Sequence, residues 1–122
     1  MSNWPDVAVI MPVLNEEKYL ANSVNSILAQ KYPGKLRIIL AIGPSQDATM
    51  AIANQLAQTN PNVEILENPT GRTPEGLNLA ITEVTEDFVI RLDAHAELSE
   101  KYIEKAIATL QSTNSDNVGG LM

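Results

Sequence analysis

The chain has 122 residues, 44% of them apolar and 19% charged, which is typical of one globular domain with a buried core. Its 15 acidic and 8 basic residues give a net charge of -7, which leaves no basic face to neutralise nucleic-acid phosphates. The absence of cysteine excludes disulfides and thiolate metal sites. Residues 1–6 lack the basic start and apolar core of an export signal, and no apolar run approaches the length of a membrane span. We therefore expect a cytoplasmic protein.

The first part of the chain alternates between apolar strands and an amphipathic helix. Val7–Met11 is a β-rich run, and Asn15, followed by two glutamates, predicts the start of a helix that reaches about Leu28. Tyr32-Pro33-Gly34 ends this helix. Residues 36–42 are apolar at every position except Arg37, as expected for a strand covered on both faces.

The same alternation continues to the last residue. Thr73-Pro74-Glu75 predicts a helix start, with a cap, a first-turn proline and an acid that suits the helix dipole. The remaining predicted elements are a helix at 48–59, a strand at 63–66, a helix at 73–82, a strand at 88–92, a helix at 99–110 and a strand at 118–122.

Alternating strands and helices predict an α/β fold, a Rossmann-like, doubly wound, mostly parallel sheet with helices on both faces. If the first three strands lie in the order 3-2-1 and the fourth lies beside the first, the strand order reverses between strands one and four. Ligands bind beyond the carboxyl ends of the strands at such a point. The loops 12–16 and 93–95 are therefore predicted to meet at the site.

The chemistry of these loops favours a divalent cation. The glycines match neither the dinucleotide motif G-x-G-x-x-G nor the phosphate-loop motif G-x-x-x-x-G-K-[ST]. A diphosphate here would therefore lack a cradle of backbone N–H groups. Asp93 and His95 are spaced to project into one loop and are suitable ligands for Mg²⁺ or Mn²⁺.

Each of these residues also has an ordinary structural interpretation. Asp93 at a strand end is suited to capping a turn, and Glu16 to favouring a helix dipole. Asp47 is suited to capping the second helix. Arg72, beside Gly71, is suited either to an anion or to solvent.

Four segments, taken in order and at their separations, resemble family 2 glycosyltransferases, and within these the succinoglycan-biosynthesis type. They are Val9-Ile10-Met11-Pro12-Val13-Leu14-Asn15-Glu16-Glu17, Ser45-Gln46-Asp47-Ala48-Thr49, Gly71-Arg72-Thr73-Pro74-Glu75-Gly76-Leu77-Asn78 and Ile90-Arg91-Leu92-Asp93-Ala94-His95-Ala96-Glu97-Leu98. The resemblance implies the GT-A fold, a nucleotide-diphospho-sugar donor, Mg²⁺ or Mn²⁺, and inverting transfer to an acceptor hydroxyl.

The resemblance also implies roles for particular residues. It places Asp93 near the ribose and the metal, with His95 as a metal ligand in place of the second acid of the family's D-x-D. The donor-binding residues that it implies are Pro12, Val13, Asn15, Glu16, Asp47, Arg72, Asn78 and Asp93.

This sequence departs from the family pattern after the second strand. The family's D-D-G-S-x-D-x-T begins with an acid that contacts the base, whereas this chain has Ile42, Gly43 and Pro44 before Ser45. The identity of the nucleotide is therefore left open.

The resemblance further implies that residues 1–122 are the nucleotide-sugar-binding half of a longer domain. The general base that deprotonates the acceptor is expected beyond the fifth strand. We accordingly assign no catalytic residue within this chain, and expect it to be inactive alone. The family often carries downstream membrane helices, so the full-length protein is expected at the inner face of the cell membrane. Its acceptor would be a saccharide or a lipid-linked acceptor.

Two other functions are also compatible with the sequence. One is a non-catalytic α/β module that forms a homo-oligomer through the surface that the missing half would cover. The other is a metal-dependent phosphohydrolase using Asp93 and His95, although the additional acid and histidine clusters usual in such sites are absent from the sequence.

Overall fold

A computed structural model describes residues 4–30, 32–94, 98–99 and 101–113 of the chain. Four strands and four helices alternate along this part of the sequence. Among the described residues, no helix combines the length and the apolar character of a membrane span.

The strands form one parallel sheet with the order β3-β2-β1-β4. Their bounds are Val7–Val13 for β1, Leu36–Ile42 for β2, Val63–Glu67 for β3 and Phe88–Arg91 for β4. The predicted order, with the fourth strand beside the first, is confirmed. The strand order therefore reverses between β1 and β4, and the carboxyl ends of these two strands lie next to each other.

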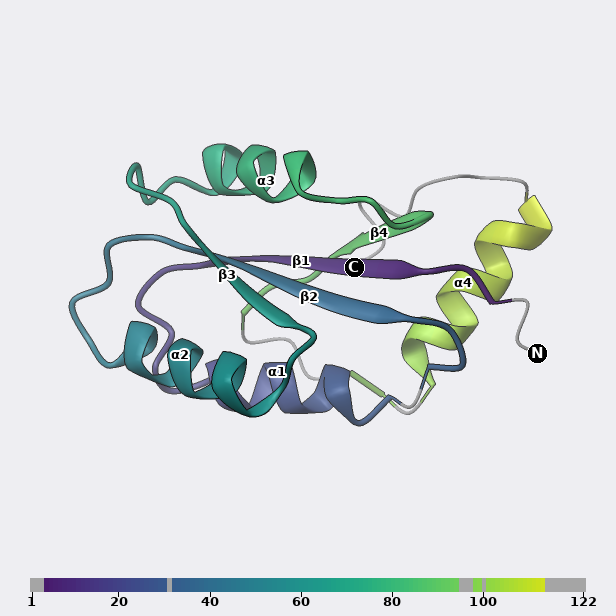
Figure 1. Ribbon diagram of the computed structural model, residues 1–122, viewed down its shortest axis with the longest axis horizontal. Coiled ribbons are helices and arrows are strands. Elements are labelled where there is room, and N and C mark those ends of the chain that lie inside the picture. The colour runs from purple at the N-terminus through teal and green to yellow at the C-terminus, as the bar shows by residue number, and fades with distance from the viewer. Residues whose placement is uncertain (1–3, 31, 95–97, 100, 114–122) are drawn as a thin grey trace.

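Helices cover both faces of the sheet, as the doubly wound fold predicts (Figure 1). Their bounds are Leu20–Leu28 for α1, Thr49–Thr59 for α2, Thr73–Thr82 for α3 and Tyr102–Thr113 for α4. In Figure 1, α3 lies above the sheet, whereas α1 and α2 lie below it. Residues of α4 pack into the same apolar cluster as α1 and α2.

Alternating side chains of the strands divide the core into two layers. Val7, Val9 and Met11 of β1 join the larger cluster, which lies between the sheet and helices α1 and α2. Ile10, between them in sequence, packs instead with Ile39 and with Ala80 of α3. Because both faces of the sheet are covered, the strands are apolar at almost every position. The sequence showed this as continuous apolar runs.

Two predicted elements need comment. Asn15 does not begin the first helix: its φ is 51°, in the left-handed region, and α1 begins at Leu20. The helix-start pattern at Asn15 was misleading because asparagine also tolerates left-handed backbone, and here it makes a turn. The fifth strand predicted at 118–122 lies outside the described residues.

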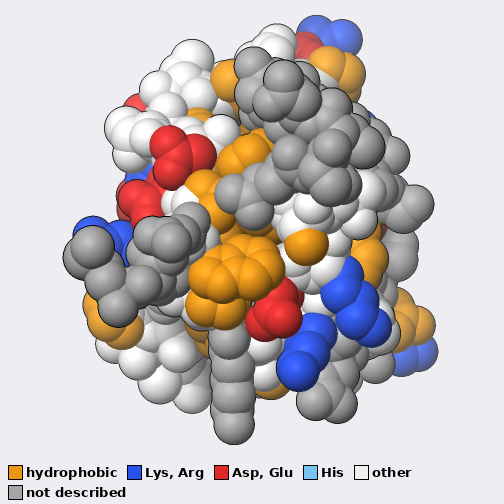
Figure 2. All heavy atoms as spheres, turned by 90° about the vertical axis from the view of Figure 1, so that its right-hand side faces the viewer, with side chains coloured by type: hydrophobic (Ala, Val, Ile, Leu, Met, Phe, Trp, Pro, Cys, Tyr) orange, Lys and Arg blue, Asp and Glu red, His pale blue; other side chains and the backbone are white. Residues whose placement is uncertain are grey.

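At the end of the sheet where the strands begin, Trp4 packs edge-on against Tyr32, with ring centroids 5.7 Å apart. Figure 2 views the molecule from this side and shows apolar side chains gathered on the face, with charged side chains around them. The Tyr32 hydroxyl donates to the carbonyl oxygen of Pro5 at 2.6 Å, and burial raises the pKa of Tyr32 to about 12. This contact holds the segment before β1 against the connection between α1 and β2.

Two glycines meet at the opposite end of the sheet. A Cβ on Gly43 would lie 2.8 Å from the Cα of Gly71, and Gly71 itself has a φ of 69°. The close approach holds the segment after β2 against the segment before α3.

We predict that Gly43→Ala destabilises the protein by about 1–3 kcal/mol, because the added methyl group must push the backbone at Gly71 away. Urea unfolding followed by circular dichroism measures this change. Asn54→Ala, at an exposed position of α2, is the control and is expected to be nearly neutral. Equal unfolding midpoints for Gly43→Ala and the wild type would show that the contact is not tight.

Candidate donor-binding site

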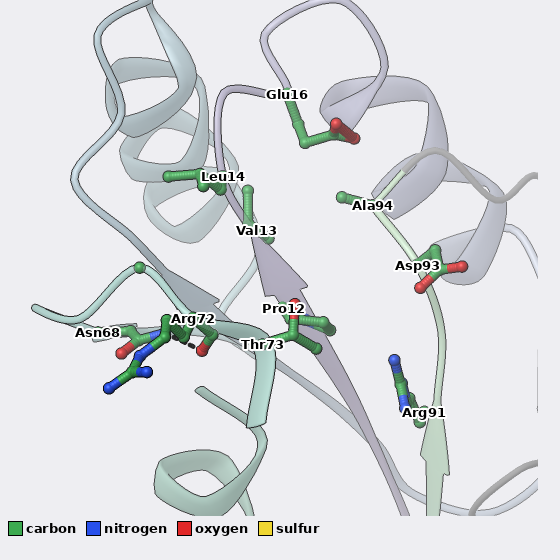
Figure 3. A pocket seen from close by; sticks show the side chains of 11 residues that line it. Pro12, Val13, Leu14, Glu16, Asn68, Arg72, Thr73, Arg91, Asp93 and Ala94 are labelled. Atoms are coloured by element: carbon green, nitrogen blue, oxygen red, sulfur yellow. Dashed lines mark hydrogen bonds between the residues drawn. The ribbon is translucent and has the colours of Figure 1, made fainter. Parts of the chain in front are cut away.

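A pocket of about 200 Å³ lies at the carboxyl ends of β1 and β4 (Figure 3). It is lined by the end of β1 and the loop after it, the segment before α3, and the end of β4. The lining residues are Pro12, Val13, Leu14, Glu16, Asn68, Gly71, Arg72, Thr73, Arg91, Asp93 and Ala94. Of the residues predicted to bind the donor, five line this pocket: Pro12, Val13, Glu16, Arg72 and Asp93. Their roles in binding remain predictions.

Asn15 lies beside the pocket and joins two loops instead of lining it. Its backbone N–H donates to Ser45 Oγ at 2.9 Å, and its Oδ1 accepts from the N–H of Gln46 at 2.8 Å. Both contacts cross from the loop after β1 to the loop after β2. The left-handed backbone of Asn15 allows its side chain and its N–H to reach the same neighbouring loop.

Asp47 completes this connection between the loops. Its carboxylate accepts from the Thr49 hydroxyl, from the Thr49 N–H at 3.0 Å and from the Glu17 N–H at 3.3 Å. The Thr49 hydroxyl oxygen in turn accepts from the N–H of Glu16 at 2.8 Å. The hydrogen bond from the Thr49 side chain lowers the pKa of Asp47. Asp47 thus bonds to Thr49, the first residue of α2, although the N-cap residue is Ala48 and has no side-chain cap hydrogen bond, and Asp47 is not among the residues lining the pocket.

Arg72 lines the pocket but is directed away from its centre. The guanidinium pairs with Glu75 at 2.9 Å, and the side chain is 75% exposed. In Figure 3 it points away from Arg91 and Asp93. Asn78 lies farther along α3 and faces a different cavity, which it shares with Thr70 and Leu79. The structure thus separates Asn78 from the other predicted site residues.

Arg91 is a pocket residue that the sequence analysis did not select. It is the last residue of β4, and its Nε is shielded from solvent without a hydrogen-bond partner among the described residues. Arg91 and Asp93 both line the pocket, and a spacing of two residues in an extended chain is suited to this. The two-residue spacing from Asp93 could have indicated Arg91 as a pocket residue. The missing hydrogen-bond partner of its Nε is apparent only from the three-dimensional structure.

The oxygen donors at the pocket suit a hard divalent cation. Asp93 and Glu16 both line it, and carboxylate oxygens are ligands that Mg²⁺ and Mn²⁺ prefer. His95, the predicted second ligand, lies outside the described residues. Within the part of the chain that the structure describes, no group of three or more His, Cys, Asp or Glu residues is arranged to hold a metal ion. A metal here would therefore need ligands from His95 or from the bound molecule as well.

Comparison with known proteins now identifies the family. The family model described as "Glycosyl transferase family 2" matches residues 8–122. The chain belongs to glycosyl transferase family 2. The resemblance seen in the four sequence segments is thereby confirmed, and so is the fold that it implied.

Two relatives and one structural neighbour illustrate the family. The chain is 30% identical to the succinoglycan biosynthesis protein ExoA of Rhizobium meliloti over 90% of its own length and 34% of ExoA. It is 31% identical to the glycosyltransferase AglE of Haloferax volcanii, over 98% of this chain and 40% of AglE. The chain therefore spans between a third and a half of the length of these relatives.

The structural neighbour is the mannosyltransferase PcManGT from Pyrobaculum calidifontis, which was solved in complex with GDP-Man and Mn²⁺. It superposes with a TM-score of 0.81 at 28% identity, over 89% of this chain and 33% of that chain. The parallel sheet described above thus has the same arrangement in a larger glycosyltransferase.

We predict that Asp47→Asn lowers the Tm at neutral pH, because the charged acceptor joins the loops after β1 and β2. A carboxyl group with a lowered pKa in the folded state stabilises the fold above its unfolded pKa of about 3.9. That contribution is lost as the pH falls through the folded pKa. The Tm difference between wild type and variant should therefore be larger at pH 7 than at pH 3, as measured by differential scanning calorimetry.

Glu83→Gln is the control, because it removes an exposed acid at the far end of α3. It should show no comparable pH-dependent difference. A Tm of Asp47→Asn equal to that of wild type at pH 7 would contradict a role for the Asp47 charge in holding the loops.

Proposed function

We propose that residues 1–122 form the donor-binding half of an inverting glycosyltransferase. The enzyme transfers a sugar from a nucleotide-diphospho-sugar to an acceptor hydroxyl in polysaccharide or glycolipid synthesis. The observation that carries the proposal is the pocket where the loop after β1 meets Asp93, at the strand reversal of a family 2 chain. The succinoglycan biosynthesis protein and the mannosyltransferase among the similar proteins support it.

The donor's diphosphate would bind at Asp93 with Mg²⁺ or Mn²⁺. No glycine-rich loop cradles a phosphate here, and the chain is acidic. A dianionic group beside Asp93 and Glu16 therefore needs added positive charge. The bound ion would offset the charge that develops on the departing diphosphate. Asp93 and His95 are the residues of this chain that we propose as its ligands, and the complex of PcManGT with Mn²⁺ supports the choice of metal.

The other parts of the reaction are assigned by inference from the family. We propose that the general base lies outside residues 1–122, that the acceptor is a saccharide or a lipid-linked acceptor, and that the full-length protein works at the cytoplasmic membrane face. Formation of a homo-oligomer through the surface that the missing half would cover stays a separate prediction. The phosphohydrolase alternative, which also uses Asp93 and His95, stays a separate prediction, and the sequence lacks the additional acid and histidine clusters usual in such sites.

The proposal predicts binding of a nucleoside diphosphate, UDP or GDP, that depends on Mn²⁺. Isothermal titration calorimetry should detect heat with Mn²⁺ and at least about tenfold weaker binding after chelation, since the diphosphate then lacks its counter-charge. Asp93→Asn should reduce binding in Mn²⁺ to near the level of the chelated wild type. Asp87→Asn, which changes an acid just before the opposite end of β4, is the matched control and should bind as wild type does.

Absence of heat with every nucleoside diphosphate, in a sample whose circular dichroism shows a folded protein, would refute the proposed function. Binding that is unaffected by chelation would instead remove only the metal from the proposal.

For His95 we predict that His95→Ala abolishes metal-dependent sugar transfer by the full-length enzyme while its circular dichroism spectrum stays unchanged. His95→Asp restores the family's D-x-D and should recover activity, with a changed preference between Mg²⁺ and Mn²⁺, because it replaces an imidazole by a harder oxygen ligand. Full activity of His95→Ala would show that His95 is not a ligand.

A further inference from the structure

The position of Arg91 sets it apart from the other cations of the chain. In the register of the sheet, Arg91 pairs with Ile10 of β1, and Leu92 donates to the carbonyl oxygen of Ile10 at 3.1 Å. Asp93 follows two residues later, just past the end of β4, and also lines the pocket; an extended chain advances about 6–7 Å over two residues. Arg91 therefore lies deeper than Asp93, on the side of the sheet that α3 covers. Figure 3 shows its side chain between β4 and the part of the pocket near Pro12.

The hydrogen bonding of Arg91 is incomplete. Its Nε is buried and has no partner among the described residues, and no described acid lies within 4.0 Å to form an ion pair with it. The other two arginines behave differently. Arg37 pairs with Glu86 at 2.7 Å and with Glu64 at 2.9 Å, and Arg72 pairs with Glu75. A buried N–H donor without a partner is unfavourable, and such a group in a pocket wall is suited to an acceptor on a ligand.

The surroundings of Arg91 indicate which part of the nucleotide sugar supplies the hydrogen-bond acceptor for its Nε–H group. Asp93 and Glu16 line the same pocket, so its wall combines carboxylate groups with the guanidinium of Arg91. Sugar hydroxyls both donate and accept, and they match this mixture without adding charge. Pockets for drug-sized ligands are about 300–1,000 Å³, so a cavity of about 200 Å³ suits a smaller group.

We propose that Arg91 is a specificity-determining residue that donates hydrogen bonds to hydroxyl oxygens of the sugar to be transferred. This inference rests on the proposed function, in which the diphosphate lies at Asp93 and the attached sugar extends from it into the pocket. Arg91 then distinguishes a nucleotide sugar from the bare nucleoside diphosphate. Arg72, paired with Glu75 and exposed, is not suited to the same contact.

The test compares two pairs of ligands on the full-length protein in Mn²⁺: UDP with UDP-GlcNAc, and GDP with GDP-Man. For the pair that wild type binds, Arg91→Met should lower the affinity for the nucleotide sugar by about 10- to 100-fold, as expected for loss of a charge-assisted hydrogen bond. The affinity for the nucleoside diphosphate should change less than about twofold. Lys105→Met, which removes an exposed cation from α4, is the control and should change neither affinity.

A second measurement observes the contact in the wild type and uses a variant only to assign the signal. In ¹⁵N-labelled wild type, residues 1–122 contribute three arginine Nε–H signals, and the signal that is lost in Arg91→Lys is the one from Arg91. That signal should shift on addition of the nucleotide sugar and much less on addition of the nucleoside diphosphate.

The outcomes separate this inference from the function on which it rests. If wild type binds the nucleoside diphosphate, but Arg91→Met weakens both ligands equally or neither, Arg91 does not contact the sugar and only this inference fails. An Arg91 signal that responds equally to both ligands leads to the same conclusion. If wild type binds no nucleoside diphosphate at all, the proposed function fails as well.

Discussion

The parallel pairing of β1 with β4 is the constraint on which the site depends. β1 also pairs with β2 on its other side, so the chain must cross from one edge of the growing sheet to the other before β4 can form. The pairing is held by apolar side chains on both faces, such as Ile10 and Ile90, which are 3% and 0% exposed. Because the two strands are parallel and in register from Val7 with Phe88, their carboxyl ends bring Asp93 beside the loop after β1.

Electrostatics divides the pocket into two parts with different needs. At its mouth, Asp93 and Glu16 add negative charge in a chain that is already acidic, so a diphosphate there depends on an added cation. Deeper in, Arg91 supplies positive charge that no described acid neutralises. β4 thus ends on a hydrogen-bond donor, Arg91, and an acceptor, Asp93, follows two residues later. Both orientations follow from one period-two pattern, which is why β4 contributes more to the site than its length suggests.

Much of the fold could be predicted from the sequence, because apolar runs and turn residues are local signals. β2 and α3 were placed at the residues where the structure has them. Contacts between distant segments were less visible. Asn15 matched the pattern of a helix start, yet its side chain accepts a hydrogen bond from the backbone of Gln46 in the loop after β2. In the sequence, Arg91 resembles any polar residue at the end of a strand. That its Nε lacks a hydrogen-bond partner depends on the side chains that β1 and α3 place around it, and these come from distant parts of the sequence.

The departure from the family pattern after β2 has a packing explanation. Ile42 is 1% exposed and belongs to the core, so an acid there would be a buried charge without a partner. A side chain at Gly43 would collide with Gly71, whose segment lines the pocket. Neither position 42 nor position 43 can therefore present a carboxylate to the base of a nucleotide. Ser45 and Asp47 keep the part of the segment that joins the loops after β1 and β2, and this joining holds the backbone of Glu16 at the pocket that Asp93 also lines.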